Sequence, residues 1–280
     1  RTGLITYMRT DSTRISDVAL GSVRNYIEKE LGKEYLPEKP NYYANKTASQ
    51  DAHEAIRPTN VKYHPDEVAK YLTPEQYKLY SLIWKRFVAS QMKSSISEQF
   101  SIEVECGNKI LTATTSKVIF DGFLKVYDVS KSQKEKVLPE DIEKGATLKV
   151  LKVNGEQKFT EPPPRYTEAS LVKEMEELGI GRPSTYAPTI YTLTKRYYVK
   201  KEKKTLIPTE LGRAVNKLLV EYFPEMITTS FTSKMEEKLD FVEEGKIDWK
   251  SVVKEFYEEF LPVLEHAYEN MENIKGSFDE

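Results

Sequence analysis

The chain has 280 residues, of which 39% are hydrophobic and 31% charged, a composition typical of a globular protein of about two domains rather than a disordered or fibrous one. No stretch approaches the roughly 20 apolar residues that a membrane span needs. The formal net charge of −2 excludes a globally basic nucleic-acid-binding protein, so contact with nucleic acid would have to be local. The single cysteine, Cys106, cannot form an internal disulfide, and a reducing, cytoplasmic setting is expected.

The N-terminal third predicts two helices that flank a long polar segment. The chain runs at once into a strand-like stretch at 4–7. Apolar residues at helical spacing predict a helix over 17–31, ended by Gly32, and a capping pattern predicts another over 73–92. The apolar face expected for the second helix consists of Leu79, Ile83, Phe87 and Val88. The proline-punctuated segment 37–65 between them reads mostly as loop.

The middle of the chain changes to a strand period. A β-hairpin is predicted here, because apolar and polar residues alternate from Phe100 to Cys106, Gly107-Asn108 can form the turn, and a second strand begins at Ile110. Further strands are expected at 118–120, 123–129 and 147–153. The prolines at 162–164 hold an extended path that cannot join a sheet interior, so they indicate a domain boundary.

The last part of the chain is predominantly helical. We expect a helix at 167–178, a tight turn at 179–181, a second helix at 184–196 capped by Ser184, and a basic hairpin at 198–207. This order of elements resembles a winged helix. Three more helices are expected at 208–222, 232–244 and 248–272, the last with a kink at Pro262. The expected fold class is mixed α+β and multidomain.

The first candidate site lies just after the strand-like N-terminal stretch. Side chains alternate along a strand, so Tyr7 and Arg9 would face the same side. A phenol with an ordinary pKa near 10 is a weak nucleophile, and a neighbouring cation both activates it and stabilises charge on a phosphate, which favours phosphodiester chemistry. The alternative is a tyrosine packed at a strand edge, with Arg9 paired to Asp11 on the surface.

The second candidate site is the segment around His53. His53 and Arg57 lie four residues apart, so they would meet on one helical turn and could grip a phosphate. The alternative is a capped helical turn with a solvated histidine. A metal site is less favoured, because the other histidines, His64 and His266, lie in unrelated sequence contexts.

The third candidate site comprises two helix N-termini, whose free backbone N–H groups can bind phosphate. Arginines and hydroxyls flank them: Arg165, Thr167 and Ser170 at one, and Arg182, Ser184 and Thr185 at the other. Aromatic residues interleaved with cations could stack bases, namely Tyr186, Tyr191, Tyr197 and Tyr198 beside Lys195, Arg196 and Lys200. The alternative is that these tyrosines are buried in a helical core.

Three blocks together resemble one protein family. The segment GLITYMRTDSTR at 3–14 resembles the nucleophile motif of type IA DNA topoisomerases. The segment AHEAIRP at 52–58 resembles the family's histidine segment, and GIGRPSTY at 179–186 resembles its single-strand-binding segment. The resemblance spans nearly the whole chain, and Met8 and the wording of 181–185 favour the bacterial topoisomerase I branch.

The resemblance implies that Tyr7 cleaves and reseals one DNA strand through a 5′-phosphotyrosyl intermediate and relaxes negatively supercoiled DNA without ATP. Arg9 would hold the scissile phosphate and His53 would assist. The implied residues for binding single-stranded DNA are Thr10, Asp11, Ser12, Arg57, Arg165, Thr167, Ser170, Arg182, Ser184, Thr185 and Tyr186. The implied location is the cytoplasm, in association with the nucleoid.

The resemblance also implies a toroidal core made of several domains. Here they would be a nucleophile-bearing domain at 1–93, a β-rich arch at 94–160 and a helical, winged-helix-like base at 161–280. The acidic cluster that binds Mg²⁺ in the family is missing and would lie in an upstream Toprim domain, so this chain is expected to bind no metal and to be inactive in relaxation alone. A non-enzymatic winged-helix module that binds duplex DNA is the alternative, but it accounts for the second half only.

Overall fold

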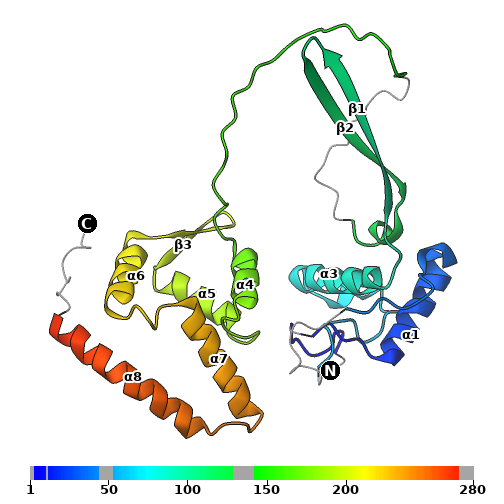
Figure 1. Cartoon of the computed structure of the whole chain (residues 1–280). Coiled ribbons are helices and arrows are strands. Elements are labelled where there is room, and N and C mark those ends of the chain that lie inside the picture. The colour runs from blue at the N-terminus through cyan, green and yellow to red at the C-terminus, as the bar shows by residue number, and fades with distance from the viewer. Residues whose placement is uncertain (1–2, 11, 44–52, 129–141, 271–280) are drawn as a thin grey trace. The chain divides into compact units, whose positions relative to one another are not determined.

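The computed structural model describes residues 3–10, 12–43, 53–128 and 142–270. It divides the chain into two compact units, Arg1–Asn154 and Gly155–Glu280 (Figure 1). Each unit combines helices with a two-stranded antiparallel sheet, so the mixed α+β class is confirmed. The finer division into three domains, with boundaries after residues 93 and 160, stays a prediction.

Two principal helices of the first unit form where the capping signals place them. Helix α1 (Asp17–Tyr26) continues as a π-helical turn, η1 (Ile27–Leu31), and Gly32 ends it with a φ of 116°. Helix α3 (Pro74–Ser90) begins with a complete capping box, as predicted. Short helical pieces lie between them at η2 (Lys33–Tyr35), α2 (Pro65–Val68) and η4 (Ala69–Tyr71).

The core of the first unit lies between α1 and α3. Its buried members are Ala19, Val23, Ile27, Val61, Val68, Tyr80, Trp84, Phe87, Val88 and Met92. The expected face of α3 is partly wrong, because Leu79 is exposed while Tyr80 and Trp84 are buried. Trp84 can be buried because its indole N–H donates to Val61 O at 2.9 Å. Leu4 and Ile5 pack against this core, which anchors the chain just before Tyr7.

The predicted hairpin is confirmed and is longer than expected. Strands β1 (Ile96–Cys106) and β2 (Lys109–Phe120) pair antiparallel and extend away from the helices of the unit (Figure 1). The turn needs a residue that tolerates a positive φ, and Gly107 supplies it with a φ of 60°. The expected strand at 118–120 is the end of β2.

Two other expected strands are wrong. The first of these segments begins with a 3-10 helix, η5 (Gly122–Lys125). Phe123 and Val126 both pack against the core, and a helical path turns side chains three residues apart toward the same side. Residue 129 lies outside the described residues. Residues 147–153 form no strand. An alternating pattern does not provide a hydrogen-bonding partner, and among the described residues the sheet of this unit consists of β1 and β2 alone.

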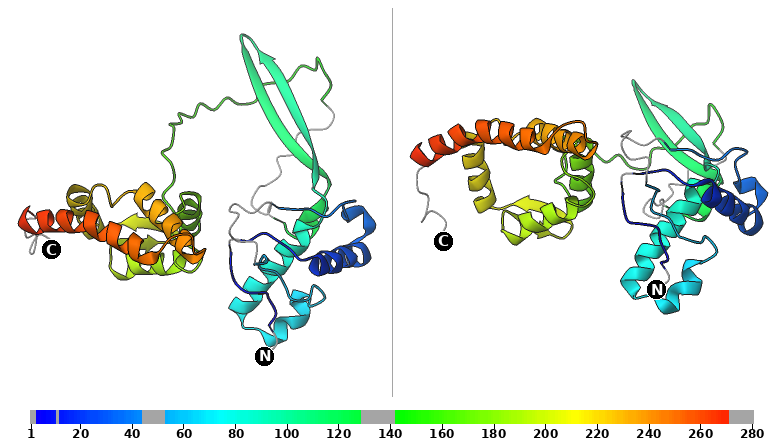
Figure 2. Two further views of the ribbon diagram at one scale, coloured as in Figure 1. Left: turned by 60° about the horizontal axis from the view of Figure 1, so that its bottom comes forward. Right: turned by 90° about the horizontal axis from the view of Figure 1, so that it is seen from below.

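The second unit follows the expected order of elements (Figure 2). Its elements are α4 (Glu168–Glu177), α5 (Tyr186–Lys195), β3 (Val199–Glu202), β4 (Thr205–Pro208), α6 (Glu210–Tyr222), α7 (Thr229–Glu243) and α8 (Trp249–Asn270). Helix α8 contacts α6 and α7 and contains Pro262 in its interior. The expected cap of α5 is wrong, because Thr185, not Ser184, is its N-cap residue, and it makes no side-chain capping bond.

Candidate functional site

Two segments far apart in the sequence lie side by side around Tyr7. Ile5 and Pro58 form an antiparallel bridge. The backbone hydrogen bonds that join the segments run from Thr6 N–H to Arg57 O (2.9 Å), from Thr59 N–H to Leu4 O (3.0 Å) and from Ala55 N–H to Arg14 O (2.8 Å). The prediction of a helical turn that carries His53 and Arg57 is therefore wrong, because backbone groups of residues 53–59 form hydrogen bonds with the N-terminal segment instead.

The structure brings Tyr7 and His53 together. Their ring centroids lie 6.2 Å apart with an interplanar angle of 30°. Tyr7 is 76% exposed, so it is not the packed strand-edge tyrosine of the alternative interpretation. His53 is half-buried, and among the described residues its ring nitrogens make no hydrogen bond. An exposed phenol beside an uncommitted imidazole is an arrangement that a phosphate group could enter.

Buried Ser12 fixes the backbone beneath His53. Ser12 is a buried polar residue, only 5% exposed. Its hydroxyl donates a hydrogen bond to His53 O at 2.7 Å. The Ser12 hydroxyl oxygen also accepts a hydrogen bond from Arg14 N–H at 3.3 Å. The Arg14 side chain adds a second bond to His53 O, from Nε at 3.4 Å. Ser12, which was expected to bind DNA, is thus placed to position His53. Arg14 is a further neighbour of His53 that the sequence did not single out, although it lies in the same motif.

We expect Ser12→Ala to loosen the His53 segment. The change removes the shorter of the two hydrogen bonds to His53 O and leaves Arg14 N–H without its acceptor, at a cost of about 1–3 kcal/mol in the free energy of unfolding. Any covalent chemistry at Tyr7 should slow on the order of tenfold, because it depends on positioning. Chemical denaturation and a DNA cleavage assay measure the two effects. Ser22→Ala, at an exposed position of α1, is the control, and equal behaviour of the two variants would contradict the positioning role.

The strand-like path expected for Tyr7 and Arg9 ends at Thr6. Arg9 N–H donates to Tyr7 O at 3.0 Å, which closes a three-residue turn about Met8. The alternation from which a shared side was predicted therefore does not extend to these two residues. Arg9 is half-buried and Thr10 is exposed, whereas Asp11 lies outside the described residues.

Arg57 is already paired in the structure. Its Nη2 lies 2.6 Å from Glu54 Oε2, and its Nε donates to the same oxygen at 2.9 Å. Burial alone would raise the pKa of Glu54, but hydrogen bonds from Arg57 and Ser16 and the charges of Arg57 and Arg14 lower it below its ordinary value of 4.5. Arg57 therefore contributes to the local structure beside His53, and a phosphate would compete with Glu54 for its guanidinium.

The Glu54 pair should make the first unit sensitive to acid. Because the pKa is lower in the folded state, the stabilisation is fully present above about pH 4.5 and is lost as the pH falls through the folded value. We expect Glu54→Gln to be less stable than the unchanged protein at pH 7, with a difference that shrinks on acidification. Urea unfolding between pH 7 and pH 3 measures this, and a difference independent of pH would contradict it.

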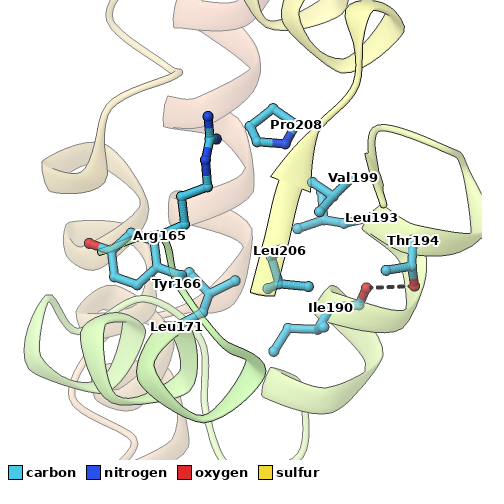
Figure 3. Close-up of a pocket in the computed structure, with 9 residues that line it drawn as sticks. All are labelled: Arg165, Tyr166, Leu171, Ile190, Leu193, Thr194, Val199, Leu206 and Pro208. Carbon is cyan, nitrogen blue, oxygen red and sulfur yellow. Dashed lines mark hydrogen bonds between the residues drawn. The ribbon is translucent and has the colours of Figure 1, made fainter. Parts of the chain in front are cut away.

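In the second unit, Arg165 stands at the rim of an apolar pocket of about 210 Å³. Figure 3 shows the apolar side chains gathered between α4, α5 and the hairpin: Leu171, Ile190, Leu193, Val199 and Leu206. Arg165 is exposed, and no ion-pair partner lies beside it among the described residues. Of the two arginines at the helix starts, Arg165 is the one available to an anion.

The hydroxyls at the start of α4 are engaged in capping. Thr167 Oγ1 accepts from Ser170 N–H at 3.1 Å, and Ser170 Oγ accepts from Thr167 N–H at 2.8 Å. Both residues thus form a capping box, which stabilises the helix and occupies the N–H groups that a phosphate would use. At the start of α5, Thr185 Oγ1 accepts from Arg182 N–H at 2.8 Å, while Ser184 is exposed.

Arg182 is held by acidic residues of α7. Its Nη2 lies 2.5 Å from Asp240 Oδ2, and its Nη1 lies 3.7 Å from Glu236. Burial would lower the pKa of Arg182, but the hydrogen bond and charge of Asp240, with the charge of Glu236, raise it. The geometry therefore gives Arg182 a structural role, since it fastens the turn before α5 to α7.

The tyrosines of the second unit do not share one environment. Tyr191 is 63% exposed and Tyr197 is 75% exposed, so the expected alternative of buried tyrosines is wrong for these two. Tyr186 and Tyr198 are half-buried. The Lys195 ammonium lies 5.6 Å from the centre of the Tyr191 ring, a cation–π contact at the surface.

Clusters of metal-ligating side chains and membrane-spanning helices are both absent from the part of the chain that the structure describes. No three His, Cys, Asp or Glu side chains gather into a group able to hold a metal ion there. None of the described helices combines the length and the apolar character that crossing a bilayer demands.

Comparisons with known proteins place these features in context. The family model described as DNA topoisomerase matches residues 1–254. Among solved structures, the chain is similar to full-length topoisomerase I from Thermotoga maritima, with 46% sequence identity and a TM-score of 0.78. The match covers 93% of this chain and 42% of the Thermotoga chain, so this chain spans less than half the length of that relative.

Proposed function

The chain belongs to the DNA topoisomerase family, and on that premise we propose that it is the part of a bacterial type IA enzyme that carries the nucleophile, Tyr7. The observation that carries the proposal is the exposed Tyr7 phenol held beside His53 by hydrogen bonds between two distant segments. The substrate is a single-stranded stretch of negatively supercoiled DNA.

The proposed reaction exchanges one phosphodiester for another. The phenolic oxygen of Tyr7 forms a bond to phosphorus while the bond between phosphorus and the 3′ oxygen breaks. The phenolic proton passes to water, and the 3′ oxygen takes up a proton from water to become a free hydroxyl. The 5′-phosphotyrosyl link conserves the bond energy, so the hydroxyl can attack it and reseal the strand without ATP.

Arg9 and His53 act on the phosphate in this proposal. A guanidinium is always charged and can donate two parallel hydrogen bonds to phosphate oxygens, so Arg9 stabilises the charge that builds up during attack. His53 donates to the same phosphate when protonated, and its place beside the Tyr7 ring supports that role. Thr10, Asp11 and Ser12 are also assigned to DNA binding in this proposal, with Ser12 acting mainly through His53 O.

The second unit binds the strand that leads to Tyr7. The residues of the second unit proposed for this contact are Arg165, Thr167, Ser170, Ser184, Thr185 and Tyr186, with Arg182 acting through the turn that it stabilises. Arg57, in the first unit, acts through the segment beside His53. Arg165 makes the main phosphate contact because it is exposed and unpaired among the described residues. Contacts of this kind bind the backbone and read little sequence.

Relaxation of supercoils belongs to a longer polypeptide in this proposal. Mg²⁺ and a Toprim domain supply the charge stabilisation that the described residues cannot provide alone, and this chain by itself does not relax DNA. The test of the proposed function is a covalent adduct between the protein and labelled single-stranded DNA that depends on Tyr7. A non-enzymatic winged-helix module would bind DNA, prefer duplex and form no adduct.

A further inference from the structure

Helix α5 ends in a strained conformation at Tyr197. Tyr198 N–H donates to Leu193 O at 3.0 Å and Tyr197 N–H donates to Thr194 O at 3.1 Å, the bond pattern of a Schellman C-cap. The residue after the cap in this motif adopts a left-handed conformation and is usually glycine, but here it is Tyr197, with a φ of 57°. The conformation is held firmly, because Thr209 Oγ1 donates to Tyr197 O at 2.6 Å.

Packing of the Tyr197 ring does not compensate for this strain. The residue is 75% exposed, so its ring gains little from burial. A left-handed conformation disfavours any residue with a Cβ, and glycine would relieve the strain. Strained backbone that gives no packing in return is found where function requires a particular side chain.

We infer that Tyr197 is a stacking platform for an unpaired base of the single-stranded DNA bound by the second unit. The inference rests on the proposed function, which brings a single strand to this unit. An exposed aromatic ring on a fixed backbone stacks on any base with little loss of conformational freedom, and stacking of this kind tolerates all sequences.

The cations around Tyr197 fit a nucleic-acid strand. Arg196 precedes it and carries no ion-pair partner among the described residues, and Lys195 lies against the exposed ring of Tyr191. Aromatic rings beside cations are typical of single-strand binding, whereas a ring finds no free face on the stacked bases of a duplex.

The test compares affinity and stability in the same variants of the whole chain. The probe is a fluorescein-labelled oligonucleotide of mixed sequence, titrated at fixed salt as a single strand and as a duplex. Tyr197→Gly should weaken single-strand binding about 5- to 30-fold, the loss of one stacked base. Its unfolding midpoint should stay unchanged or rise, because glycine removes the strain. Tyr197→Phe should keep the affinity, and Tyr268→Ala, at a tyrosine that is 82% exposed in the same unit, is the control.

The outcomes separate this inference from the proposed function. If the unchanged chain binds single strands but Tyr197→Gly binds equally well, the stacking role is overturned and the proposed function stands. A lower unfolding midpoint for Tyr197→Gly would show that the ring serves the fold, which also overturns the inference. Absence of single-strand binding by the unchanged chain would count against the proposed function itself.

Discussion

Replacing Tyr7 by phenylalanine is expected to abolish the covalent protein–DNA adduct while binding of single-stranded DNA persists. The substitution removes only the oxygen that attacks phosphorus, so adduct formation should fall by at least about 10³-fold. The fold should not change, because the Tyr7 side chain is 76% exposed and its hydroxyl makes no hydrogen bond among the described residues. The measurement is denaturing electrophoresis after mixing with labelled DNA and Mg²⁺, with and without a separately made Toprim domain.

A matched control is available in the same unit. Tyr71 is 73% exposed, so Tyr71→Phe makes the same chemical change at a similar exposure and should leave the adduct unchanged. An adduct that requires the added Toprim domain would locate the metal chemistry there. An adduct that survives in Tyr7→Phe, or none at all in the unchanged chain with that domain present, would contradict the assignment of Tyr7.

The second unit should be severely destabilised by Gly212→Ala. A Cβ built at Gly212 would lie 2.0 Å from Tyr198 O, and that oxygen is fixed because it accepts from Thr209 N–H at 3.0 Å. The start of α6 and the chain after α5 would have to move apart, so the free energy of unfolding should fall by about 3 kcal/mol. For a unit of this size that lowers the unfolding midpoint by roughly 10 °C, measurable by calorimetry.

The same substitution at another glycine should have the opposite effect. Gly21 lies in the interior of α1, and apart from its chain neighbours and the backbone of its own helix no atom comes within 4 Å of a Cβ built there. Gly21→Ala should therefore raise the free energy of unfolding by up to about 1 kcal/mol, because alanine favours the helix. Equal effects of the two changes would contradict the close backbone approach at Gly212. Single-strand binding should weaken in Gly212→Ala only.

Much of the secondary structure was predictable because local signals specify it. The capping box before α3, Gly32 after η1 and the Gly107 turn between β1 and β2 each depend on a few adjacent residues. The expected strands at 123–129 and 147–153 failed for a physical reason. A strand needs a neighbour, and alternation says nothing about whether one is present. Phe123 and Val126 pack against the core instead.

The chemistry was readable from the sequence, but the geometry of the site was not. The motif around Tyr7 and the segment around His53 indicated the family by their residues alone. Only the tertiary structure shows that these segments run side by side, that Ser12 supports His53, and that Arg57 is paired with Glu54.

Candidate chemical groups could be identified from the sequence, because nucleophiles, cations and caps are properties of residue types at short spacing. Which of these groups are available depends on contacts between distant parts of the chain. Arg182 and Arg165 looked alike as arginines at helix starts, yet one is held by Asp240 and the other is exposed. The exposure of Tyr197 in a strained turn was equally unpredictable, because burial and pairing depend on residues far away in the chain.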